Sequence, residues 1–114
     1  MPFITIRTNV TISEDIRSNL QTALGKAITD IPGKSERWLM TELAGDCTLS
    51  FQGDSKKPIA FVGVSIYGHV KPESCSRLTA DICKILESEL SIPGENVYVR
   101  YLETDKWGWN GENF

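Results

Sequence analysis

The chain repeats one pattern of elements, and this repeat constrains its fold more than any other feature. "IPG" occurs at 31–33 and again at 92–94, each time between a stretch with helical apolar spacing and a stretch of strand formers. Proline followed by glycine ends a helix. In this chain, a predicted strand also precedes each of the two predicted helices. Two β-α-β units side by side predict an α+β fold, a four-stranded sheet with two helices on one face in a ferredoxin-like arrangement.

The two units begin with strands of different kinds. "PFITIRTNV" at 2–10 places Ile4 and Ile6 on one face and Phe3, Thr5 and Arg7 on the other, which predicts a half-buried strand. "PIAFVGVSI" at 58–66 is almost continuously apolar, which predicts a central strand covered on both faces. Further strands are predicted at "RWLMTEL" (37–43) and "NVYVRYL" (96–102), with a short one at "TLSFQG" (48–53).

Two amphipathic helices are expected, one in each unit. Ser13 can cap the first, whose first turn carries Glu14 and Asp15, and Pro72 suits the first turn of the second. Their apolar stripes are Ile16, Leu20, Ala23, Leu24, Ala27 and Ile28 in the first helix, and Leu78, Ile82, Ile85, Leu86 and Leu90 in the second.

Both helices lie on the same face of the predicted sheet, so the other face has no cover within one chain. We expect the apolar strand residues to exceed what two helices can bury, and a second subunit to bury the remainder. The residues concerned are Ile4, Ile6, Val62, Val64, Val97 and Val99. The sequence therefore predicts an oligomer.

Size and charge limit the functions that we expect. With 114 residues the chain is predicted to form a single domain over 1–114. The formal net charge is -3 and the longest cationic run is Lys56-Lys57, so no nucleic-acid partner is expected. No cationic segment leads into an apolar block at the N-terminus, and no stretch has the roughly 20 apolar residues of a membrane span. We expect synthesis in the cytoplasm, no membrane insertion, and a leaderless route for any secreted protein.

Cysteine and histidine give little support to metal or thiol chemistry. The three cysteines, Cys47, Cys75 and Cys83, form no C-x-x-C motif, so neither a disulfide framework nor a redox motif is predicted. His69 is the single histidine and is interpreted as a loop residue. No metal site and no cofactor are expected.

Pro2 is the first candidate for chemistry. Proline is tolerated as the first residue of a strand, and this is the structural interpretation. The chemical interpretation is that removal of Met1 exposes a secondary amine. Terminal amines titrate near roughly pKa 7.7–8.0, and burial among apolar neighbours disfavours the charged form. An amine kept neutral in this way can act as a general base.

Cationic and phenolic side chains are candidates for binding an acid. Lys34 follows the first "IPG"; it can hold a carboxylate and lower the pKa of a nearby amine, or it can be a solvated loop residue. Tyr98 and Arg100 project from one face of a strand, which suits a planar anion. The alternative for Arg100 is an ion pair with Glu103 or another surface acid.

The aromatic residues are weaker evidence for a binding pocket than the cationic and phenolic residues. Trp38, Trp107 and Trp109 can form its wall, or they can be core or interface residues. Gly68 follows Tyr67 at the end of the central strand, where a glycine lets a ligand approach backbone N–H groups.

Short motifs spread over the whole chain resemble those of one known family. They are Met-Pro at the start, "TNV" at 8–10, "GK" at 33–34, "LSFQGDSKKP" at 49–58, "SIYG" at 65–68, "NVYVRYL" and the terminal "WGWNGENF". Their order and spacing resemble the macrophage migration inhibitory factor family. The resemblance implies a tautomerase fold assembled as a homotrimer with active sites at subunit boundaries. It also implies keto–enol tautomerase activity on phenylpyruvate-like or dopachrome-like substrates, without a cofactor, and cytokine-like signalling through a cell-surface receptor.

The resemblance assigns roles to individual residues. Pro2 matches the catalytic base and Lys34 the lysine that binds the carboxylate of a small aromatic keto acid. Tyr98 matches a tyrosine contributed by the adjacent subunit. Trp38 lies where the family has an aromatic wall, and Trp109 near the mouth of the pocket.

Three departures from the family pattern bear on these expectations. Tyr67 replaces a usual isoleucine whose backbone N–H contacts substrate, so the amide is kept but the entrance can be narrower. Arg100 replaces a common asparagine, which either tightens the binding of acids or competes with Lys34 for the carboxylate. The C-x-x-C of some members is absent, with 59–62 in its place. One alternative is therefore a signalling or binding protein with a vestigial pocket, and another is a binding module that retains Met1.

Overall fold

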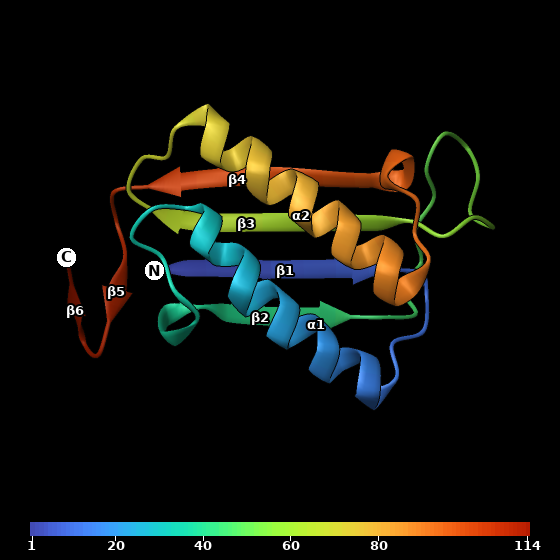
Figure 1. The fold of residues 1–114 in the computed structure, drawn as a ribbon, viewed down its shortest axis with the longest axis horizontal. Coiled ribbons are helices and arrows are strands. Elements are labelled where there is room, and N and C mark those ends of the chain that lie inside the picture. The colour runs from blue at the N-terminus through green and yellow to red at the C-terminus, as the bar shows by residue number, and fades with distance from the viewer.

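The computed structural model describes residues 1–114 and consists of a four-stranded mixed sheet with both long helices on one face (Figure 1). The strand order is β2-β1-β3-β4; β1 runs parallel to β2 and antiparallel to β3, and β3 runs parallel to β4. The predicted pair of β-α-β units is confirmed. Their elements are β1 (Pro2–Thr8), α1 (Glu14–Ala27) and β2 (Met40–Ala44), then β3 (Ala60–Tyr67), α2 (Pro72–Leu90) and β4 (Val97–Thr104).

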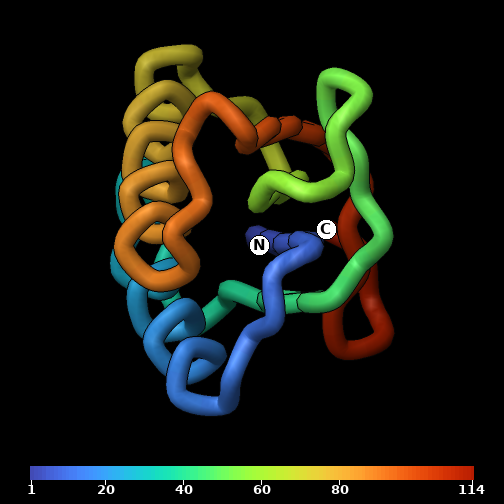
Figure 2. Tube along the Cα trace, turned by 90° about the vertical axis from the view of Figure 1, so that its right-hand side faces the viewer, coloured from blue at the N-terminus to red at the C-terminus, as the bar shows by residue number.

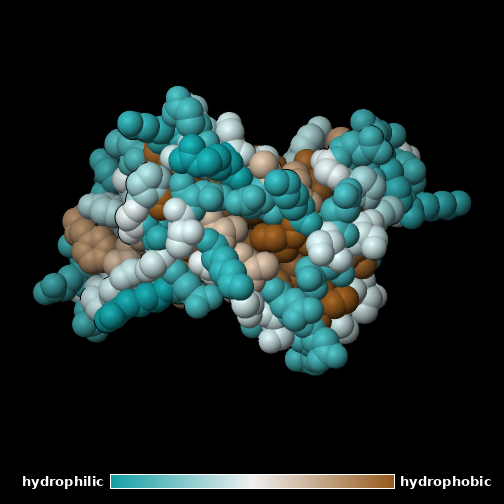
Figure 3. All heavy atoms as spheres, viewed as in Figure 1, coloured by the Kyte–Doolittle hydropathy of each residue, from teal (hydrophilic) through white to brown (hydrophobic).

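Both helices begin as the sequence predicts. The Ser13 side chain accepts a hydrogen bond from the Ile16 N–H, and Pro72 occupies the first turn of α2. Their outer surfaces carry mainly hydrophilic side chains (Figure 3). Neither helix combines the length and the apolar content that crossing a bilayer requires.

Two predicted strands differ from the structure. Arg37 and Trp38 belong to a 3-10 turn, Glu36–Trp38, so β2 begins only at Met40. The segment predicted as a short strand at 48–53 is a turn closed by one bridge between Phe51 and Asp54. At the C-terminus, β5 (Gly108–Trp109) and β6 (Glu112–Asn113) form a small hairpin. Figure 2 shows this segment and the β2–β3 loop on the side of the sheet away from the helices.

The hydrophobic core lies between the helices and one face of the sheet. It contains 17 buried residues, among them Ile4, Ile6, Val62 and Val64. Val97 and Val99 pack against the same cluster. The expectation that these six residues exceed the cover of the two helices was wrong, because alternation along the strands directs all of them to the helical face.

The side chains between them occupy the open face, the face of the sheet away from the helices. β3 lies inside the sheet as predicted, but cover on both faces was wrong for one chain, since Phe61 and Ser65 are only half-buried. Large apolar side chains project from the open face: Met40 is 68% exposed, Tyr98 62% and Leu102 50%. The unburied apolar surface is therefore real, although it belongs to other residues than those expected.

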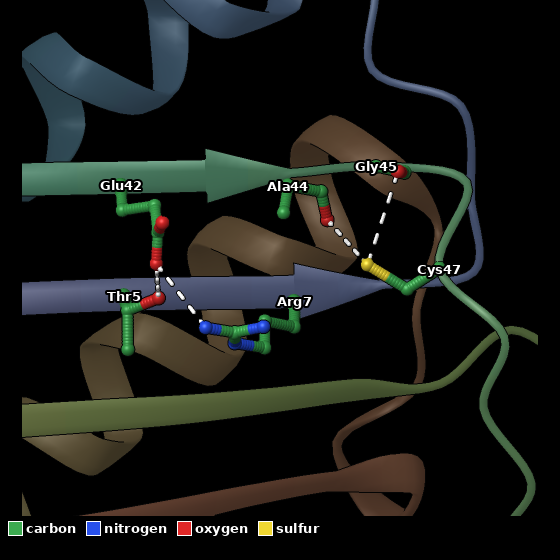
Figure 4. A network of polar contacts seen from close by, with 6 residues as sticks. All are labelled: Thr5, Arg7, Glu42, Ala44, Gly45 and Cys47. Atoms are coloured by element: carbon green, nitrogen blue, oxygen red, sulfur yellow. Dashed lines mark hydrogen bonds and ion pairs between the residues drawn. The ribbon is translucent and has the colours of Figure 1, made fainter.

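Polar side chains interrupt the open face near β2. The Thr5 hydroxyl donates to Glu42 Oε1 at 2.6 Å, and Arg7 forms an ion pair with the same carboxylate at 3.6 Å (Figure 4). At the end of β2, the Cys47 thiol points toward the carbonyl oxygens of Ala44 and Gly45. Cys47 thus contacts only its own turn through its thiol and is a free cysteine.

Candidate active site

Pro2 begins β1 and is buried, so the start of the chain is held inside the fold. Its strand partner is Ile66 on β3. Immediately before it, the Met1 carbonyl accepts a hydrogen bond from the Tyr67 N–H at 3.2 Å. The Met1 carbonyl therefore occupies the Tyr67 N–H, a backbone donor beside the N-terminus.

Lys34 faces the same point from the turn after α1. Its ammonium donates to the Tyr67 carbonyl oxygen at 3.0 Å, which fixes the cation beside the α-amino group. Burial, followed by the charge and the hydrogen bond of Lys34, lowers the pKa of the Met1 amine from 8.0 to about 6. Because the shift is downward, the amine is mainly neutral at pH 7.

Tryptophans form a wall beside Pro2. A cavity of about 330 Å³ is lined by Met1, Pro2, Trp38, Trp109 and their neighbours. The Trp38 and Trp109 rings meet edge to face, with centroids 5.0 Å apart, and the Arg37 guanidinium lies 5.2 Å from the Trp38 ring centre. The structure thus brings together Pro2, Trp38 and Trp109, which are far apart in the sequence.

Tyr67 ends β3 next to the amine and carries a ring that the C-terminus covers. Its centroid is 5.4 Å from that of Phe114, at an interplanar angle of 68°. Gly68 follows with φ +98°, a conformation that favours glycine, and its N–H donates to the Thr104 carbonyl. Sequence reasoning gave no role to Phe114 or Arg37, although Phe114 ends the terminal "WGWNGENF" motif.

Lys34 also belongs to a second group of polar and cationic residues. It borders a second cavity of about 320 Å³, together with His69, Lys71 and Ser74. His69 lies in a loop, as interpreted, and its Nδ1 is 3.2 Å from Glu103 Oε2. This end of the sheet therefore places the cations Lys34 and Lys71 around one cavity.

Tyr98 lies near the other end of the sheet, and Arg100 lies midway along β4. They share the open face as predicted, but Tyr98 pairs with Phe61, whereas Pro2 pairs with Ile66. Five residues of strand separate these positions, roughly 17 Å at the rise of an extended chain. The alternative ion pair of Arg100 with Glu103 is wrong, because the guanidinium lies 5.1 Å from the Phe61 ring centre and makes no ion pair. Within one chain, neither residue joins Pro2 and Lys34.

Comparison with known proteins decides which family this geometry belongs to. The family model described as "Macrophage migration inhibitory factor (MIF)" matches residues 1–114. The chain belongs to the macrophage migration inhibitory factor family. The resemblance drawn from the sequence motifs is confirmed, and with it the membership of the tautomerase superfamily.

Relatives in this family match the chain from end to end. The macrophage migration inhibitory factor of Xenopus laevis is 33% identical over 116 residues, which cover 100% of this chain and 99% of that protein. The solved structure of Leishmania major MIF2 has a TM-score of 0.93 at 35% identity and covers 100% of this chain and 97% of its own. A Prochlorococcus marinus homologue has a TM-score of 0.82 at 28% identity, with 98% of each chain covered. The family fold is therefore shared over the full length.

Proposed function

We propose that the protein is a keto–enol tautomerase that acts on phenylpyruvate-like or dopachrome-like substrates, with the amine of Pro2 as general base after removal of Met1. The lowered pKa of the α-amino group beside Lys34 is the observation that carries the proposal. An amine with a pKa of about 6 is roughly 90% neutral at pH 7 and can accept a proton. We expect the same surroundings to lower the pKa of the Pro2 amine, one residue further along, once Met1 is removed.

The proposed reaction moves one proton between carbon and oxygen. Pro2 removes it from the carbon next to the ketone and returns it to the oxygen, while Lys34 holds the carboxylate of the substrate. The Tyr67 N–H, which Met1 occupies in the unprocessed chain, becomes a donor to the growing negative charge on oxygen. Trp38 and Trp109 pack against the aromatic ring of the substrate. Groups of the protein itself account for each step, so no cofactor is invoked.

A homotrimer completes the proposed site. The exposed Met40, Tyr98 and Leu102 give the open face an apolar surface that association would bury. Since Tyr98 lies far from Pro2 in its own chain, it is proposed to reach the Pro2 of an adjacent subunit, as the family resemblance implies, and Arg100 on the same face is proposed to accompany it. There the Arg100 guanidinium adds a second cation for an acidic substrate.

The function is tested with phenylpyruvate and protein whose Met1 is shown by mass spectrometry to be absent. Pro2→Gly retains a terminal amine but loses the secondary amine and its ring. We expect enol formation to fall about 10²-fold to 10⁴-fold, the usual contribution of a general base. Equal rates for the parent and Pro2→Gly would remove Pro2 from the mechanism.

Membership of the family favours a second candidate function, cytokine-like signalling by a protein with a vestigial pocket. The Phe114 ring packs on Tyr67 at the end of β3, and in this proposal the two rings hinder substrate entry. In this proposal a cytoplasmic protein leaves the cell by a leaderless route and binds a cell-surface receptor. Cell binding by catalytically inactive Pro2→Gly, equal to that of the parent, supports signalling without catalysis; loss of both contradicts it.

A further inference from the structure

The lining of the cavity beside Pro2 contains a cationic residue and no acidic one. Arg37 is among its lining residues, together with Trp38 and Trp109, and the lining includes no aspartate or glutamate. A second cation, Lys34, lies beside the terminal amine at the same end of the sheet. The pocket therefore has two cations, although a phenylpyruvate-like acid brings only one carboxylate.

The 3-10 turn Glu36–Trp38 places Arg37 on the tryptophan wall of the pocket. This turn and the β5–β6 hairpin both lie near the N-terminus, at the left of Figure 1. The guanidinium lies 5.2 Å from the ring centre of Trp38 and forms no ion pair within the chain. A cation–π contact leaves N–H donors of the planar fork available, and such a fork can bind a carboxylate through two hydrogen bonds.

The two acidic residues of the same segment are engaged elsewhere. The Glu36 carboxylate lies against Gly25 on α1, in the space that the β-carbon of any other residue would occupy there. The Glu42 carboxylate on β2 accepts from Thr5 and pairs with Arg7. Neither acid neutralises Arg37, so a negative charge on a bound substrate can do so.

We propose that the pocket prefers an aromatic keto acid with a second carboxylate on its ring, and that Arg37 binds this second carboxylate. The inference rests on the proposed function and names its substrate class. Lys34 holds the carboxylate next to the ketone, the ring packs along Trp38 and Trp109, and the guanidinium on Trp38 meets the acidic group at the ring. Two cations then face two carboxylates, which is the charge complementarity that gives specificity.

Phenylpyruvate and 4-carboxyphenylpyruvate differ by one carboxylate and are compared as substrates of protein shown by mass spectrometry to lack Met1. We expect a higher kcat/KM for the second acid, mainly through a lower KM, because the contact with Arg37 lies away from the reacting atoms. In Arg37→Gln, kcat/KM for this acid should fall about five-fold to ten-fold, between the effects of an exposed ion pair and of a buried charged hydrogen bond. Phenylpyruvate should change less than about two-fold. Arg37→Lys keeps the charge and should keep part of the preference.

Lys84→Gln is the matched control, since it removes one positive charge from an exposed position on α2. It should leave the ratio of kcat/KM for the two acids unchanged. Equal losses for both acids in Arg37→Gln would overturn the inference and leave the tautomerase function in place. A preference that survives in Arg37→Gln but disappears in Arg100→Gln would overturn it in the same way.

Failure of the proposed function is recognised separately. If neither keto acid is turned over, the tautomerase proposal fails, and binding then decides the role of Arg37. The probes are 3-phenylpropionate and its 4-carboxy derivative, which lack the ketone and are titrated by calorimetry. Tighter binding of the diacid by the parent but not by Arg37→Gln supports the role of Arg37, whereas equal or absent binding contradicts it.

Discussion

The two ends of the sheet differ in the kind of chemistry that they expose. At the Pro2 end, the chain terminus lies beside the Lys34 ammonium, and the pKa of the terminal amine is lowered to about 6. At the Tyr98 end, three aromatic side chains border an apolar cavity that has no charged lining residue. The contrast shows that the two ends of one sheet expose different groups, a cation beside the chain terminus at one end and aromatic rings at the other.

The largest expected effect tests whether the two ends meet across a subunit boundary. Pro2→Gly and Tyr98→Ala should each be nearly inactive alone. In mixed trimers, a site can receive Pro2 from one variant and Tyr98 from the other, so activity should recover to about one quarter of the parent value. The measurement is phenylpyruvate enolisation after joint unfolding and refolding of the two variants.

A site contained in one chain gives no such recovery. The control is a mixture of Pro2→Gly with Lys34→Ala, which act at the same end; it should show much less recovery, since these two residues come from one subunit.

A smaller effect is expected when the cation at the Pro2 end is removed. Lys34→Ala should lower kcat/KM for a keto acid about 10-fold to 100-fold, the usual contribution of a hydrogen bond to a charged group. Because Lys34 depresses the pKa of the amine, its loss should also raise the pKa seen in the pH–rate profile and reduce the neutral fraction at pH 7.

Lys71→Ala is the matched control for Lys34→Ala. Lys71 borders the same cavity of about 320 Å³ but does not reach the Tyr67 carbonyl. An unchanged pH–rate profile in Lys34→Ala, or an equal shift in Lys71→Ala, would contradict the role given to Lys34.

The smallest expected effect concerns stability at the Pro2 end, just before the turn that carries Lys34. A hydrogen bond with Asp81 raises the pKa of Asp30, and burial and the Asp81 charge raise it further, with Arg77 acting in the opposite direction. Since the pKa of the folded state lies above that of the unfolded state, the pair stabilises at low pH and loses this contribution as pH rises through the folded pKa.

Asp81→Asn should therefore raise the free energy of unfolding at pH 7 by less than about 1 kcal/mol. It should also make this free energy less dependent on pH above the ordinary pKa of an aspartate. Urea unfolding at several pH values measures both. Asp105→Asn, in the turn after β4, is the control and should leave the profile as it is. A loss of stability at pH 7 in Asp81→Asn would show that the pair is not repulsive.

Local patterns in the sequence were enough to predict the architecture. The repeated "IPG", the Ser13 cap and the apolar stripes are each set within a few residues, so they identified both β-α-β units correctly. Which strand residues the helices bury was predicted less well. Alternation shows which residues share a face of the sheet, but not which face the helices cover or how much of it they bury. Met40 and Leu102 were not recognised for this reason.

The candidate site was predicted only in part. Lys34, Trp38 and Trp109 were named as candidates from their residue types and given roles by the family resemblance, and the structure places all three near the N-terminus. The contact of Phe114 with Tyr67 depends on packing between distant segments, which no spacing in the sequence records.

Titration of the N-terminal nitrogen in the processed protein, followed by ¹⁵N NMR of Pro2, is the most direct measurement of the central claim. We predict a secondary amine with a pKa near the value of about 6 found for the terminal amine beside Lys34. A pKa of 8 or above, or a nitrogen still blocked by Met1, would contradict Pro2 as a neutral base.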